Sequence, residues 1–300
     1  MTRSFFPWRV AAVLALGVCT LPAALAGTLE NIRAAQQIVL AYRESSVPFS
    51  YLDGAGRPVG YSMDLCLKVV DAVRRELGMP SLSVGYLAVT AATRIPALAE
   101  GRAALECGST TNTAERRKQV AFTIPHFISS VRLLVRADSG FRSLDSLAGR
   151  TVTATAGTTT MPTLRRLNAE HDLRLNIVEA ADHAKAFMSL ESGQADAFAL
   201  DEVLLYGLRA NAAKPQAWEV VGKAMSIEPY AIMLPPRDAA FKKVVDQEMR
   251  RLIVSGEIQA VYRKWFLQAI PPKGINLELA MPSMLKDSFR FPSDKVGDLE

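Results

Sequence analysis

Short apolar runs alternate with segments of helical period along most of the chain, and this alternation strongly constrains its fold. The run Ile38-Val39-Leu40-Ala41-Tyr42 predicts a core strand, and apolar residues between positions 65 and 77 fall at helical spacing. The pattern begins again near the middle, with a strand predicted over 151–154 and a helix over 164–168. Strands that alternate with helices are typical of α/β domains with largely parallel sheets. The two similar halves predict two lobes that face one cleft.

The first 26 residues have the pattern of a secretory signal peptide. Arg3 and Arg9 precede an apolar run, and Ala24-Leu25-Ala26 supplies small residues for cleavage after Ala26. A lipoprotein signal at Leu16-Gly17-Val18-Cys19 is a poor alternative, because a bulky valine stands where a small residue is preferred. No later run approaches the roughly 20 apolar residues of a membrane-spanning helix. The mature chain is therefore expected to be soluble and exported.

Charge and cysteine content limit the expected partners only weakly. The formal charge is +5, and removal of Arg3 and Arg9 leaves +3, which is too small to indicate nucleic-acid binding. Cys66 and Cys107 remain in the mature chain. An oxidising compartment would allow a disulfide between them, whereas two buried thiols are the alternative. The sequence leaves both open, because it does not show how closely their Cα atoms approach.

Residues 107–120 hold a dense set of anion-binding groups. Ser109 and Thr111 offer hydroxyls ahead of a predicted helix, and Arg116 offers a guanidinium further along. Free N–H groups at a helix start, together with a guanidinium, suit a carboxylate. A Ser or Thr followed by Glu within a turn is also a common helix cap. The residues alone leave both interpretations open.

A second polar turn follows the strand predicted over 151–154. Gly157-Thr158-Thr159-Thr160 again places hydroxyls and free N–H groups at a helix start. Asp201 closes a further strand predicted over 195–200. An acid at that position is usually a helix N-cap, although it is also well placed to meet a ligand ammonium.

These groups together match a zwitterion with one extra acid. Arg116 suits a carboxylate, Asp201 an ammonium and Thr158 a further oxygen. Arg43 and Arg94 are two additional cations at predicted strand or helix ends. Unpaired buried charge is costly, so two spare arginines fit a second ligand carboxylate better than a neutral side chain. The pattern therefore favours an acidic amino acid.

Sequence signals for catalysis are weak. No nucleophile–base arrangement, P-loop or dinucleotide fingerprint stands out. His126, His171 and His183 lack metal-ligand spacing among themselves or with a cysteine. We therefore expect no catalytic residues, no cofactor and no metal.

Several segments, in order, carry a resemblance to a known family: Arg43-Glu44-Ser45-Ser46-Val47-Pro48-Phe49-Ser50-Tyr51, Gly60-Tyr61-Ser62-Met63-Asp64, Arg94-Ile95-Pro96, Glu106-Cys107-Gly108-Ser109-Thr110-Thr111-Asn112, Glu115-Arg116, Gly157-Thr158-Thr159, Lys264-Trp265-Phe266 and Ile270-Pro271-Pro272-Lys273. They resemble solute-binding protein family 3, and within it the periplasmic glutamate/aspartate-binding proteins of polar amino acid ABC importers. The resemblance extends over nearly the whole mature chain.

This resemblance implies the two-lobed periplasmic-binding-protein fold of type II, in which each lobe has a mostly parallel sheet flanked by helices. Two hinge crossovers would join the lobes. The implied division is a signal peptide over 1–26, a first lobe over 27–132 and 230–270, a second lobe over 133–229, and a tail over 271–300 that packs on the surface.

The resemblance also implies a set of ligand-binding residues: Arg43, Arg94, Ser109, Thr111, Arg116, Thr155, Thr158, His183 and Asp201. In it, Arg116 grips the α-carboxylate with help from Ser109 and Thr111. Arg43 and Arg94 match positions that favour a side-chain carboxylate, and Asp201 matches the ammonium position.

Some positions depart from the family pattern. Ala156 stands where relatives often have Ser, and Ala91 lies where a polar residue is common. Each change removes a secondary hydrogen bond and relaxes the preference between glutamate and aspartate. Arg117 is a second candidate for the guanidinium that faces inward, although the motif position favours Arg116. A structural role is the alternative for His183.

The resemblance implies ligand capture by lobe closure, with no bond made or broken. The implied partners are L-glutamate or L-aspartate and an inner-membrane ABC permease, for a monomer in the periplasm that binds no nucleic acid. One alternative is a cyclohexadienyl (prephenate or arogenate) dehydratase-like enzyme on the same fold. Another is an amino-acid sensor subunit for a receptor, which would use the same closure.

Overall fold

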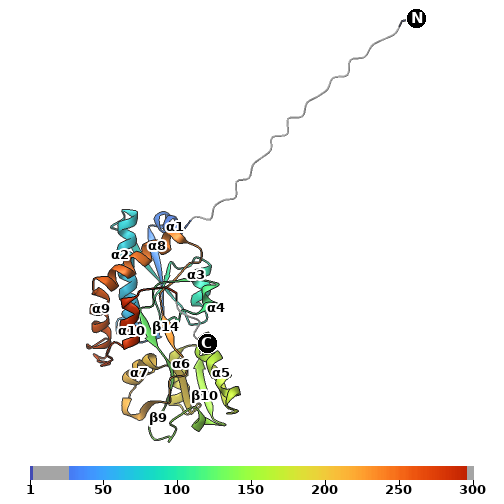
Figure 1. Ribbon diagram of the computed structural model, residues 1–300, viewed down its shortest axis with the longest axis vertical. Helices are drawn as coiled ribbons and strands as arrows, with labels where there is room; N and C mark the ends of the chain where they lie inside the picture. The colour runs from blue at the N-terminus through green and yellow to red at the C-terminus, as the bar shows by residue number, and fades with distance from the viewer. Residues whose placement is uncertain (3–26, 296–300) are drawn as a thin grey trace.

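The computed structural model describes residues 1–2 and 27–295, and the folded part forms two lobes stacked along its long axis (Figure 1). The predicted signal peptide and its cleavage site after Ala26 lie outside the described residues, apart from residues 1–2. Within the described part of the chain, no helix has both the length and the apolar character needed to cross a bilayer.

The first lobe is built on a five-stranded sheet with the order β5-β1-β6-β15-β7. β1 pairs in parallel with β5 and β6, whereas β15 pairs antiparallel with β6 and β7. The sheet is therefore mixed rather than mostly parallel as expected, because β15, which returns from the second lobe, pairs antiparallel with both of its neighbours. Its strands are β1 (Gln37–Tyr42), β5 (Ser83–Ala88), β6 (Leu105–Glu106), β7 (Ala121–Phe122) and β15 (Met233–Leu234).

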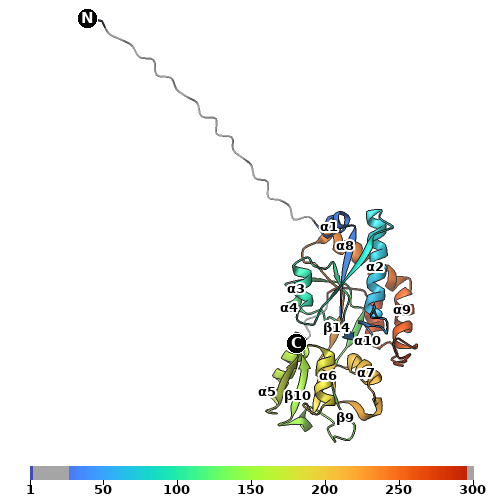
Figure 2. The ribbon, with the colours of Figure 1, turned by 180° about the vertical axis from the view of Figure 1, so that it is seen from behind.

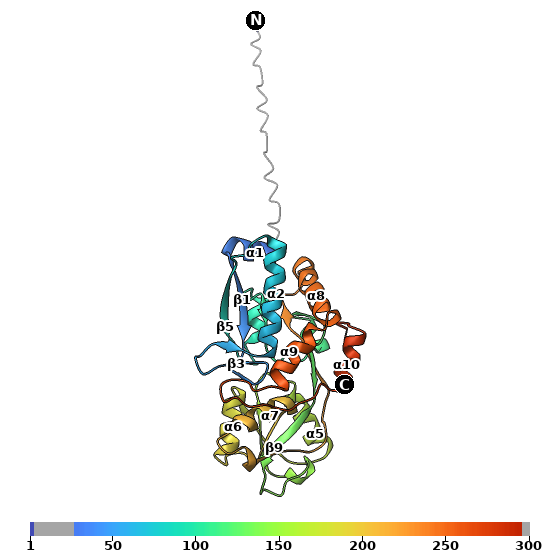
Figure 3. The same ribbon diagram turned by 90° about the vertical axis from the view of Figure 1, so that its left-hand side faces the viewer.

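Helices cover this sheet, and α2, α8 and α9 pack against one another (Figure 3). The apolar residues predicted at helical spacing form the buried face of α2, including Leu65, Val69 and Val73. α2 ends at Leu77 and is followed by the C-cap Gly78, whose φ of 65° is left-handed backbone that glycine adopts without a Cβ clash. The helices of this lobe are α1 (Thr28–Ala35), α2 (Tyr61–Leu77), α3 (Arg94–Ala99), α4 (Ala114–Arg117), α8 (Ala239–Val254) and α9 (Glu257–Phe266).

The second lobe repeats the plan with the strand order β11-β10-β12-β9-β13. β10 pairs in parallel with β11 and β12, and β9 adds antiparallel pairs with β12 and β13. Three helices, α5, α6 and α7, pack on it (Figure 2). Its elements are β9 (Val131–Arg136), β10 (Thr151–Thr155), α5 (Thr160–Glu170), β11 (Asn176–Ala180), α6 (His183–Glu191), β12 (Ala197–Asp201), α7 (Glu202–Asn211) and β13 (Trp218–Val221), with short 3-10 turns η1 (Asp145–Leu147) and η2 (Pro215–Ala217).

Two segments carry the chain between the sheets. β8 (Phe127–Ser129) precedes β9, and β14 (Glu228–Tyr230) precedes β15. The two crossovers pair antiparallel, with Ile128 opposite Pro229. We propose that this pair is the hinge. The division of the lobes at 132/133 and 229/230 stays a prediction, and β9 already begins at Val131.

Smaller elements complete the first lobe. β2 (Ser45–Ser46), β3 (Ser50–Leu52) and β4 (Pro58–Val59) form a short antiparallel sheet. The tail contains α10 (Ser283–Arg290), whose Leu285 and Phe289 are buried one turn apart. This helix was missing from the sequence analysis, because two apolar residues in a Pro-rich, polar segment are too weak a periodic signal.

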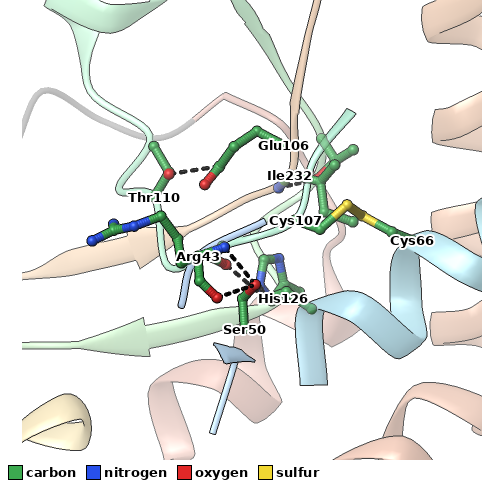
Figure 4. Close-up of a disulfide and its surroundings, with 11 residues drawn as sticks. Arg43, Ser50, Cys66, Glu106, Cys107, Thr110, His126 and Ile232 are labelled. Atoms are coloured by element: carbon green, nitrogen blue, oxygen red, sulfur yellow. Dashed lines mark hydrogen bonds between the residues drawn. A yellow bond between two sulfur atoms is a disulfide. The ribbon is translucent and has the colours of Figure 1, made fainter. Parts of the chain in front are cut away.

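Cys66 on α2 and Cys107 after β6 form a disulfide (Figure 4). Their Cα atoms lie 6.1 Å apart, and both residues are fully buried. The structure thus selects the disulfide from the two alternatives that the sequence left open. The bond ties the main helix of the first lobe to the polar stretch over 107–120.

Replacing both cysteines with alanine should lower the free energy of unfolding by about 2–4 kcal/mol, because the bond closes a long loop in the unfolded chain. Guanidinium unfolding of the Cys66→Ala/Cys107→Ala variant would measure this loss. Wild-type protein unfolded in a reducing agent is the control and should lose a similar amount. Equal stability of all three samples would contradict the prediction.

His126 is fully buried beside Ser62, whose Oγ lies 3.0 Å from its Nε2 atom. Burial lowers the pKa of His126 to about 3. The unfolded imidazole takes up a proton below about pH 6.5, whereas the folded one does so only near its lowered pKa. Stability from this group is therefore present above about pH 6.5 and is lost as the pH falls.

Between pH 7 and pH 5, wild-type protein should lose about 2 kcal/mol more unfolding free energy than a His126→Gln variant. Urea unfolding at the two pH values measures the difference. The variant should be less stable at pH 7 but less sensitive to acid. Equal acid sensitivity of the two proteins would show that His126 does not control this loss.

Candidate ligand-binding site

The predicted site residues gather where strands from both lobes end. Arg43 directly follows β1, while Thr155 and Asp201 are the last residues of β10 and β12. The carboxyl ends of parallel strands are where open α/β sheets bind ligands. A small, partly enclosed cavity lies between these ends, and every predicted site residue except Arg116 and Thr155 lines it. The lining residues are Arg43, Arg94, Ser109, Thr111, Thr158, Thr159, His183, Leu200, Asp201 and Leu204.

Two arginines supply buried positive charge to this cavity. Arg43 is 1% exposed, and its Nη1 and Nη2 atoms have no hydrogen-bond partner among the described residues. Arg94 is 2% exposed and donates through Nη1 to Thr110 Oγ1, whereas its Nε atom lacks a partner within the described chain. Burial, and then the charge of Arg94, lower the pKa of Arg43 to about 10. Arg43 therefore stays charged at neutral pH.

Glu106 at the end of β6 partly balances these cations, and Figure 4 shows its side chain beside Thr110. It is fully buried, its Oε2 atom accepts a hydrogen bond of 2.7 Å from Thr110, and its negative charge opposes the lowering of the arginine pKa values. Gly108 leaves room for the side chains of both Glu106 and Arg43, because a Cβ atom there would lie 2.2 Å from Glu106 Oε1 and 3.0 Å from Arg43 Cγ. No role was predicted for Glu106, since its strand-end position alone did not show that Thr110 links it to Arg94.

Arg116 bridges the two lobes. Its Nη1 atom donates to the Thr111 carbonyl at 2.9 Å, and its Nη2 atom donates to the Gly157 carbonyl of the second lobe at 3.2 Å. Burial, and then Arg94, lower its pKa to about 9. Arg117 instead donates to Asn112 Oδ1 at 3.0 Å. Arg116 is therefore the arginine that reaches the interface between the lobes.

The helix-cap interpretation of residues 107–120 is confirmed, although the cap lies later than the residues singled out, and the carboxylate-binding interpretation stays a prediction. Thr113 caps α4 by accepting a hydrogen bond from the Arg116 N–H at 3.2 Å. Ser109 and Thr111 precede the cap, and their side chains line the cavity instead.

Asp201 is buried, and its side chain makes no cap hydrogen bond to α7. Tyr230 of the crossover β14 donates its hydroxyl to Oδ2, while Oδ1 has no partner among the described residues. Burial, and then the charge of Glu228, raise the pKa of Asp201 to about 8. The usual N-cap interpretation therefore does not apply here.

His183 and Thr155 of the second lobe are hydrogen-bonded to each other. His183 Nδ1 lies 2.8 Å from Thr155 Oγ1, and Asp182 rather than His183 caps α6. Burial, and then Arg43, keep the pKa of His183 well below its usual value, so its ring is neutral. Thr158 donates its hydroxyl to the Thr155 carbonyl at 2.7 Å.

Several neighbouring residues were not expected from the sequence. Leu200 and Leu204 line the cavity beside Thr159 of the predicted polar turn, while Glu228 and Tyr230 contact residues around it. No local signal marked the last two, because the site residues that they contact, Thr111 and Asp201, are distant from them in the sequence. Within the described ranges, no group of His, Cys, Asp and Glu residues could hold a metal ion.

A sequence model of bacterial extracellular solute-binding proteins, family 3, matches residues 38–268. The chain belongs to this family. It is 47% identical over 275 residues to an L-glutamate/L-aspartate-binding protein of Pseudomonas aeruginosa, with 91% of each chain covered. A glutamate/aspartate import solute-binding protein of Escherichia coli is 41% identical over 273 residues, which cover 91% of this chain and 90% of that one.

A solved structure of a mutant of ArgBP from T. maritima has a TM-score of 0.69 and 27% identity, and the match covers 79% of this chain and 98% of that chain. The predicted type II two-lobed fold and solute-binding function are thus confirmed.

Proposed function

We propose that this protein captures glutamate or aspartate outside the cytoplasm and delivers it to an ABC importer. The observation that carries the proposal is the pair of buried arginines, Arg43 and Arg94, which face the same cavity as Asp201. Buried charge is costly unless it is paired. A ligand with two carboxylates and one ammonium offers partners for both arginines and for the acid. The Pseudomonas aeruginosa and Escherichia coli relatives, a glutamate/aspartate-binding protein and a glutamate/aspartate import solute-binding protein, support the same ligand class.

In this proposal, Arg43 and Arg94 bind the side-chain carboxylate of the ligand. Arg116 binds the α-carboxylate together with the hydroxyl of Ser109 and the backbone N–H of Thr111, because the Thr111 hydroxyl already donates to Glu228. A guanidinium has more N–H donors than the two backbone bonds of Arg116 use, so it retains capacity for a carboxylate.

The second lobe completes the binding site. Asp201 receives the ammonium on Oδ1, while Thr155, Thr158 and His183 support that side of the ligand. Lobe closure is the capture step, because groups from both lobes meet around the ligand only when the lobes come together. An inner-membrane permease would then recognise the closed form of a periplasmic monomer, whose signal peptide is cleaved after Ala26.

A dehydratase-like enzyme is the second candidate, and one observation favours it. Burial and Glu228 raise the pKa of Asp201 to about 8, so the cavity could present a carboxylic acid as proton donor. A ligand ammonium beside Asp201 would lower this pKa again. Conversion of prephenate to an aromatic product by the purified protein would support the enzyme and contradict a purely binding role.

Calorimetry of refolded protein freed of carried-over ligand should show tight binding of glutamate or aspartate and much weaker binding of glutamine. The physical reason is that the glutamine amide cannot neutralise Arg43 and Arg94. Replacing the ligand's charged side-chain carboxylate by a neutral amide next to these buried arginines should weaken binding by about 2–5 kcal/mol. Equal affinity for glutamate and glutamine would rule out the two-arginine argument.

The arginines should differ in the effect of their removal. Arg43→Ala should lose selectivity for acidic ligands, whereas Arg116→Ala should abolish measurable binding of all amino acids, because it removes the α-carboxylate partner. Arg75→Ala is a matched control, since Arg75 pairs with Glu248 through an exposed side chain in the first lobe. It should bind like the wild type. Normal binding by Arg116→Ala would overturn its assignment.

A further inference from the structure

Glu228 begins the crossover β14 and is only 2% exposed. Three hydroxyls donate to its carboxylate. Thr111 and Thr159 donate to Oε2 at 2.6 and 2.8 Å, and Ser226 donates to Oε1 at 2.6 Å. Hydrogen bonds to an ionised acceptor are among the stronger ones in proteins.

The donors come from both lobes. Thr111 follows β6 of the first lobe and forms a β-bridge with Tyr230 of the crossover. Thr159 directly precedes α5 of the second lobe. The path from Thr111 through Glu228 to Thr159 therefore joins the two lobes by side chains at the crossover.

This path also separates two spaces. Thr111 and Thr159 line both the enclosed cavity and a wider, more open groove, and Glu228 lines the groove. Lys118 and Arg166 also line the groove, one from each lobe. The hydrogen-bonded bridge is thus part of the wall between the cavity and the groove.

Glu228 acts electrostatically on the site as well. Its charge raises the pKa of Asp201 and opposes the lowering of the Arg116 pKa. It therefore lies close enough to influence groups from both lobes, without lining the enclosed cavity itself.

We propose that Glu228 is a positioning residue for ligand capture, because its carboxylate latches Thr111 of the first lobe to Thr159 of the second in the closed form. The latch holds the wall on the groove side of the cavity. For the lobes to reopen, Glu228 must lose its hydrogen bond with either Thr159 or Thr111. The latch therefore slows ligand release and has little effect on the first encounter. This inference rests on the proposed function.

Stopped-flow kinetics with glutamate test the latch. Thr159→Val removes the hydroxyl at nearly constant shape and should speed release about tenfold, with the association rate within about twofold of wild type. Thr159→Ser keeps the hydroxyl and should restore slow release. Glu228→Gln should also speed release. In the double variant, the release rate should increase by less than the product of the two single increases, because both changes break the same bridge.

Glu248→Gln is the matched control. Glu248 is another buried carboxylate, but it pairs with Arg75 and Arg251 away from the cavity, so its loss should leave release unchanged. Wild-type protein that binds no acidic amino acid would overturn the proposed function itself. Wild-type protein that binds, with Thr159→Val releasing at the wild-type rate, would overturn only the latch.

Two further results would also reject the latch. Equally fast release from Thr159→Ser and Thr159→Val would show that the hydroxyl is not responsible. Fully multiplicative effects of Thr159→Val and Glu228→Gln would show that Thr159 acts on the ligand directly. The Thr159 pair decides the question even if Glu228→Gln does not fold.

Discussion

Burial of three guanidinium groups between the lobes is the constraint on which the rest of the site depends. Arg43, Arg94 and Arg116 each lose hydration, and this lowers their pKa values. The values of about 10 for Arg43 and about 9 for Arg116 leave both charged at neutral pH. Charges held in this way need negative partners. Glu106, Asp182 and Glu228 supply negative charge to this network, whereas burial raises the pKa of Asp201 to about 8 and leaves it largely protonated without a ligand.

A disulfide and a glycine in the first lobe hold the segment next to its buried arginines in position. The Cys66–Cys107 disulfide fixes the segment after β6 to the long helix α2. Gly108 then leaves room for the side chains of Glu106 and Arg43, which both pack against its backbone. The disulfide and the charge of Glu106 therefore both act on the segment after β6, directly before the hydroxyl-bearing residues that line the cavity.

The crossover β14 contributes more than a connection. Tyr230 donates to Asp201 of the second lobe, and Glu228 accepts from Thr111 and Thr159. Residues 228 and 230 share one face of a strand because side chains alternate along it. One crossover thus contacts groups from both lobes, which is the arrangement required for coupling ligand contacts to lobe closure.

The sequence by itself determined the strand–helix alternation, the two hydroxyl-rich turns and most residues around the cavity. These features are local: apolar periodicity predicts the elements, and polar residues at strand ends predict where a ligand could bind. The tertiary structure decided the disulfide and showed that Asp201 bonds to Tyr230 instead of capping α7. It also showed that Arg116 reaches Gly157 across the interface. These outcomes join residues far apart in the chain, and the approach of distant segments depends on packing that no local pattern records.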